Sequence, residues 1–130
     1  MPKYYYTFWF LLLLAVEVCI ALFVKTGILR HFVGDILAVI LVYCFLRLIS
    51  RLSIQKAALV ALSVGFVIEL IQYTDLVAML GLDKIGWLAI TLGTTADLWD
   101  LFAYSIGFFA ILLFEFAINK LKSNMQNNKT

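Results

Sequence analysis

The sequence contains little that would interrupt a helix or make the chain soluble. Its one proline, Pro2, leaves every later hydrophobic run without a proline break. Only 14% of the 130 residues are charged and 65% are hydrophobic, whereas an ordinary soluble domain is about 25% charged. A soluble fold of this size would expose much of its apolar surface to water, at a cost of roughly 25 cal/mol per Å². The composition therefore excludes a soluble domain and predicts an integral membrane protein.

Cysteine and histidine are also scarce, which excludes several kinds of site. Cys19 and Cys44 lie in separate hydrophobic runs without metal or disulfide spacing, so we expect them to pack as small hydrophobic side chains. His31 is the only histidine, which argues against a zinc site. The sequence has no phosphate-binding glycine-rich loop, GxSxG elbow or Cys–His pair. The sequence therefore favours a non-enzyme without deciding the question, assigns no catalytic residue and predicts no cofactor. If the protein catalysed hydrolysis or transfer, Glu69 or Asp100 would be the general base.

Four hydrophobic runs are continuous rather than alternating, which favours helices over the strands of a membrane barrel. Each run reaches or approaches the roughly 20 residues that a helix needs to cross a bilayer. The sequence thus predicts an all-α, polytopic membrane protein with residues 1–130 forming one transmembrane domain. The expected helices of this four-helix bundle span residues 4–24, 32–52, 57–73 and 98–118.

The connections between these runs differ in character. The two expected outer loops, 25–34 and 74–96, are too apolar to be freely solvated. Because unpaired peptide groups cannot face lipid, we expect these loops to contain short interfacial or re-entrant segments. The tail, residues 120–130, is polar, and we expect it to be disordered.

The basic residues predict the orientation of the chain. Four crossings place seven of the ten lysines and arginines on the side of the two termini, and such an excess marks the cytoplasmic face. We therefore expect a multi-pass protein of the cell (plasma) membrane with both termini in the cytoplasm. Tyr6 and its aromatic neighbours fit an interfacial belt on that side. Arg47 and Arg51 fit anchors to lipid headgroups, and Glu115 is expected to pair with Lys120 or one of these arginines.

Acidic residues from all four predicted helices fall at similar depth near the other side. Glu69 and Gln72 are three residues apart and share a helix face. A carboxylate in mid-membrane costs about 2.5–3.5 kcal/mol on insertion scales, so several are tolerated only where they face each other, a cation or a wet cavity. We therefore predict an outward-facing polar pocket. Its expected binding residues are Glu17, Arg30, Asp35, Glu69, Gln72, Asp97, Asp100 and Tyr104.

Other roles remain open for some of these residues. Asp35 and Asp97 lie at predicted helix starts, where a carboxylate commonly caps free amide groups. Glu69 and Asp100 lie inside their helices, which favours a functional site over bonding between helices alone. The carboxylates could be neutralised by Arg30, or by a divalent cation bound through oxygen ligands.

The run from Glu69 to Gln72, followed by residues 93–107 with Asp97 and Asp100, resembles the membrane-protein family called domain of unknown function 2809. Residues 27–47 fit the same family, and the resemblance extends over about residues 4–118. The Glu-x-x-Gln and Asp-x-x-Asp patterns also resemble the wider VanZ-like group, whose namesake confers low-level teicoplanin resistance. The resemblance implies a fold and a site but no reaction.

Two positions depart from the VanZ-like pattern. Thr94 stands where those proteins usually carry an arginine, and Tyr104 stands where they carry an asparagine. Both differences agree with the family of unknown function and argue against transferring antibiotic resistance to this chain.

Three functions are consistent with the sequence. The first is a VanZ-like protein of the bacterial cell envelope that binds a lipid headgroup or a lipid-linked envelope precursor in its acidic pocket. The second is a small oligomeric transporter or proton-coupled carrier that uses Glu17, Glu69 and Asp100 as relays. The third is a membrane scaffold subunit in which polar groups only join helices. Membrane lipids are the expected partners and a homo-oligomer is left open, whereas no nucleic-acid surface is present.

Overall fold

The computed structural model describes residues 2–24, 27–74, 79–81, 84–86 and 98–129. Its long helices are α1 (Lys3–Phe23), α2 (Ile28–Ile49), α3 (Ile54–Tyr73) and α6 (Leu98–Asn127), and the described part of the chain contains no strand. All four are long and apolar enough to cross a membrane. The predicted all-α transmembrane fold is therefore confirmed.

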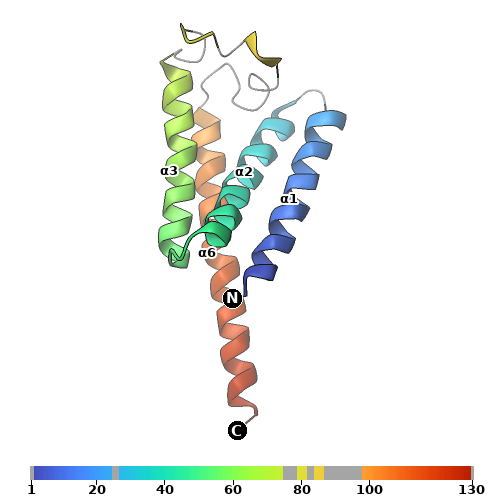
Figure 1. Ribbon diagram of the computed structural model, residues 1–130, viewed down its shortest axis with the longest axis vertical. Coiled ribbons are helices and arrows are strands. Elements are labelled where there is room, and N and C mark those ends of the chain that lie inside the picture. Colours follow the sequence, from blue (N-terminus) through green and yellow to red (C-terminus); the bar gives the residue numbers. More distant parts are fainter. Residues whose placement is uncertain (1, 25–26, 75–78, 82–83, 87–97, 130) are drawn as a thin grey trace.

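The helices run alternately up and down, so the two chain termini lie at the same end of the bundle (Figure 1). We call this the terminal end, which also holds the α2–α3 turn (residues 50–53), and we call the opposite end the loop end. Helices α2 and α6 pack together at the centre; α1 packs on α2, and α3 packs on both α6 and α2. Few α1 residues are buried, only Tyr6 and Leu13, which makes α1 the most peripheral helix.

Small residues four positions apart allow α3 and α6 to approach their neighbours closely. On α3 the buried face contains Ala57, Ala61 and Gly65. On α6 a Cβ atom at Gly107 would lie 2.8 Å from the carbonyl oxygen of Ile36, so only glycine fits against the backbone of α2. Because lipid supplies no hydrophobic force between helices, this close packing is what holds such a bundle together.

Two helix ends differ most from the predicted bounds. Helix α2 begins at Ile28, inside the predicted loop 25–34, after Gly27 with a φ of 116°. Helix α6 continues to Asn127, so most of the predicted disordered tail is helical. Residues 119–127 contain no glycine or proline, and lysine, leucine, methionine and glutamine are good helix formers. The predicted loop 74–96 lies mostly outside the described residues.

Candidate functional site

Two carboxyl groups from different helices meet near the loop end of the bundle. The side chain of Asp35 on α2 is hydrogen-bonded to that of Asp100, which lies in the first turn of α6. Both residues are half-buried. An ionised carboxylate only accepts hydrogen bonds, so a bond between two carboxyl groups requires a proton on one of them.

Further acidic residues surround this pair. Glu69 on α3 is only 5% exposed and, like Glu17 on α1, lies close enough to Asp35 to interact with it electrostatically. Glu17 is half-buried, and its Oε1 atom has no hydrogen-bond partner among the described residues. Gly34 leaves room beside it, because a Cβ atom there would lie 3.8 Å from Glu17 Oε2. Acidic side chains from all four long helices therefore share one region.

Tyr104 completes this arrangement, which we call the loop-end cluster (Glu17, Asp35, Glu69, Asp100 and Tyr104). Its side chain is buried and interacts electrostatically with Asp35, Asp100 and Glu69. A Cβ atom at Gly65 would lie 3.0 Å from the Tyr104 ring, so the absence of a side chain on α3 provides space for the ring. The aromatic ring thus forms an apolar wall beside the carboxyl groups.

The other predicted residues lie near this cluster or outside the described chain. Gln72 is buried, one turn beyond Glu69 on α3. Arg30 is half-buried near the start of α2, roughly 7.5 Å along the helix axis from Asp35. His31 beside it is exposed. Asp97 lies outside the described residues.

The described side chains do not form a metal site. Within residues 2–24, 27–74, 79–81, 84–86 and 98–129, no three His, Cys, Asp or Glu side chains are arranged to hold a metal ion. A divalent cation needs several oxygen ligands at about 2.0–2.6 Å. The described carboxyl groups therefore do not by themselves fit the divalent cation that the sequence left open.

A second polar group, which the sequence did not reveal, lies at the terminal end. Glu115 on α6 is only 3% exposed. Its Oε1 atom accepts hydrogen bonds from the hydroxyl of Tyr43 on α2 at 2.7 Å and from that of Tyr6 on α1 at 3.0 Å. Arg47 Nη2 donates to the Tyr6 hydroxyl at 3.1 Å, and the guanidinium lies over the Tyr6 ring, 4.9 Å from its centroid. We call these four residues the terminal-end network.

This network corrects three assignments made from the sequence. Tyr6 does not belong to an interfacial belt, because it is 2% exposed and bonded inside the bundle. Arg47 was expected to anchor to lipid headgroups, but its guanidinium donates hydrogen bonds to the Tyr6 hydroxyl and to the carbonyl oxygen of Leu52. Glu115 was expected to pair with Lys120 or an arginine, whereas the hydrogen bonds that its Oε1 atom accepts come from Tyr6 and Tyr43. One signal could have shown its burial, since Glu115 is two turns beyond Gly107 on the close-packed face of α6.

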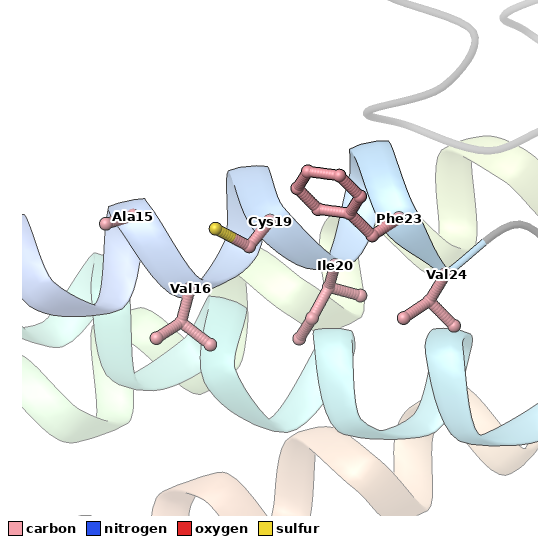
Figure 2. A pocket seen from close by; sticks show the side chains of 6 residues that line it. All are labelled: Ala15, Val16, Cys19, Ile20, Phe23 and Val24. Carbon is pink, nitrogen blue, oxygen red and sulfur yellow. The ribbon is translucent and has the colours of Figure 1, made fainter.

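An open depression on α1 is lined by Ala15, Val16, Cys19, Ile20, Phe23 and Val24 (Figure 2). All six side chains lack charge, and no residue of the loop-end cluster lines the depression. The depression is therefore distinct from the polar pocket that the sequence predicts.

Comparison with known proteins identifies the family. The family model described as protein of unknown function (DUF2809) matches residues 24–108, well over half of the chain. The chain belongs to this family. The DUF2809 match includes Asp35, Glu69, Asp100 and Tyr104, whereas Glu17 lies outside it. No curated protein and no solved structure matches the chain.

Proposed function

We propose that this DUF2809 protein binds an ammonium-bearing lipid headgroup, or a lipid-linked envelope precursor, at its loop-end cluster. The observation that carries the proposal is the hydrogen bond between Asp35 and Asp100, with Glu69 and Glu17 close by. Keeping several carboxyl groups inside a membrane protein is costly unless they have charged or polar partners. A cationic group presented by a lipid provides such a partner at the membrane surface.

The chemistry of the cluster suits a zwitterionic headgroup. A primary ammonium has three N–H donors, and charge-assisted bonds to carboxylates are the stronger kind of hydrogen bond. Asp35, Asp100 and Glu69 come from three helices and provide the acceptors. Arg30 lies further toward the loop end of α2, at the side where the phosphate of the same headgroup would be held.

The proposed setting is the cytoplasmic membrane of a bacterium, with the loop end facing outward. The excess of lysine and arginine on the terminal side supports this orientation. The Glu-x-x-Gln and Asp-x-x-Asp patterns support a VanZ-like role in the cell envelope. Tyr104, which replaces the VanZ-like asparagine, packs among the carboxyl groups themselves, so the proposal does not include antibiotic resistance.

The core between the two polar regions argues against a carrier. Three buried apolar side chains lie between the loop-end cluster and the terminal-end network. They are Leu13 on α1, Val39 on α2 and Ile111 on α6. We call these residues the apolar layer. Tyr104 and Glu115 are eleven residues apart, roughly 16 Å along α6. The described side chains therefore favour two separate polar regions over a proton relay.

A scaffold role remains the second candidate, because the Asp35–Asp100 bond also joins α2 to α6. Mass spectrometry of co-purified lipids separates the two. We expect Glu69→Gln and Asp100→Asn to retain ammonium-bearing lipids or precursors roughly tenfold less than the wild type, as expected for loss of about one charge-assisted hydrogen bond.

Glu115→Gln is the matched control, since it removes a buried carboxylate at the other end and should leave lipid retention unchanged. Thermal unfolding of each variant is measured alongside. Unaltered lipid profiles with a lowered Tm in Glu69→Gln and Asp100→Asn would establish the scaffold role and reject headgroup binding.

A further inference from the structure

Among the described residues, every exposed charged side chain at the terminal end is a lysine or an arginine. Glu115 is the only acidic residue described there, and it is buried and bonded to two tyrosines. The exposed charged residues at this end are Lys3, Arg51, Lys56, Lys120, Lys122 and Lys129. A surface with this distribution attracts anions without opposing repulsion from a neighbouring carboxylate.

The α2–α3 turn at this end is held by several hydrogen bonds. Arg47 donates to the carbonyl oxygen of Leu52, and the hydroxyl of Ser50 donates to the carbonyl oxygen of Leu46 at 2.5 Å. The backbone amide of Leu52 donates to Ser50 Oγ at 3.4 Å. Ser53 Oγ accepts from the backbone amide of Lys56 at 3.4 Å, which caps α3. The turn is thus fixed to the helices on both of its sides.

Two exposed cations flank this fixed turn. Arg51 lies two residues after the last residue of α2, Ile49, and Lys56 is the third residue of α3. Because both positions are at the ends of membrane spans, their charges lie at the level of lipid headgroups. Arg47 is directed into the bundle and bonded there, so Arg51 and Lys56 present the positive charge of the turn to its surroundings.

We infer that the α2–α3 turn binds the headgroup of an anionic phospholipid, with Arg51 and Lys56 contacting its phosphate. A guanidinium matches phosphate through paired N–H donors, and an ammonium adds a compact charge. The occupant is a lipid because the two cations lie where the hydrophobic spans end. This site lies at the opposite end from the loop-end cluster, takes a ligand of opposite charge, and does not depend on the headgroup binding proposed there.

The test uses the full chain in nanodiscs of phosphatidylcholine with a minor fraction of phosphatidylglycerol. Native mass spectrometry counts the phosphatidylglycerol molecules retained by the wild type and by the double variant Arg51→Gln/Lys56→Gln. A cation near an anionic membrane surface contributes about 1 kcal/mol. We therefore expect the double variant to retain phosphatidylglycerol roughly ten- to thirtyfold less, and Arg51→Gln alone to lose roughly fivefold.

Lys120→Gln/Lys122→Gln is the matched control, because it removes the same charge from the terminal end but away from the turn. It should change retention less than about threefold, since only diffuse attraction is lost. Equal losses in the two double variants would overturn the inference in favour of a diffuse basic surface. Unchanged retention in Arg51→Gln/Lys56→Gln would overturn it altogether.

Discussion

Replacing Gly107 with leucine is expected to lower the thermal midpoint of the bundle strongly, or to prevent folding. A Cβ atom at this position would lie 2.8 Å from the carbonyl oxygen of Ile36 and 3.2 Å from Val39 Cβ. The first of these atoms belongs to backbone, so it cannot rotate away and α2 and α6 must separate. Overpacking a core costs about 1–3 kcal/mol, and separating the two central helices should place this substitution at or above the upper value.

The measurement is thermal unfolding in detergent, followed by circular dichroism, for Gly107→Ala and Gly107→Leu. Gly34→Ala provides the control, because its Cβ atom would meet only Glu17 Oε2 at an ordinary 3.8 Å. Alanine also favours a helix over glycine by about 1 kcal/mol. Gly34→Ala should therefore leave the midpoint unchanged or raise it slightly. A Gly107→Leu protein as stable as the wild type would show that α2 and α6 do not pack as described.

Replacing Glu115 with alanine is expected to destabilise the protein by about 2–4 kcal/mol. The change removes the acceptor of two hydroxyl groups, from Tyr6 and Tyr43, and leaves a gap where three helices meet. Hydrogen bonds between membrane helices are worth about 0.6 kcal/mol on average and up to about 1.7. Tyr43→Phe, which removes only one bond, should therefore cost about 1 kcal/mol or less.

Glu115→Gln separates the role of the charge from that of the shape, since its amide oxygen can still accept both bonds. We expect it to be milder than Glu115→Ala. A double-mutant cycle between Tyr6→Phe and Glu115→Ala should give a coupling energy above about 0.5 kcal/mol, as is typical of residues in contact. Additive effects would contradict the direct bond between the two side chains.

The membrane-spanning architecture was predictable because hydrophobic length is a local property. Each long run contains enough apolar residues to cross lipid, and an even number of crossings brings the termini to one end. The meeting of Asp35 and Asp100 was predictable for a related reason. In an up-and-down bundle, the number of residues between a side chain and the end of its helix gives the depth of that side chain in the membrane. Asp35 and Asp100 both lie near the loop-end terminus of their helices, so they were expected at the same depth.

The terminal-end network was not predictable, because depth does not specify the direction of a side chain. Tyr6 and Arg47 lie at the level where tyrosine and arginine usually face lipid headgroups. Their burial depends on how α1 crosses α2 and α6, which the hydrophobic pattern of α1 alone does not encode. The length of α6 was missed because polar composition was taken as disorder, although residues 119–127 contain nothing that ends a helix.

The apolar layer also bears on how this protein experiences the electrical potential across the membrane. Leu13, Val39 and Ile111 are buried between the two polar regions, and an apolar layer of low dielectric constant takes the larger share of a voltage applied across it. Moving a charge through the full potential is worth about 2.3 kcal/mol per 100 mV, and a charge that stays on one side of this layer experiences only part of that energy. Ligand binding at the loop-end cluster is therefore expected to depend only weakly on voltage.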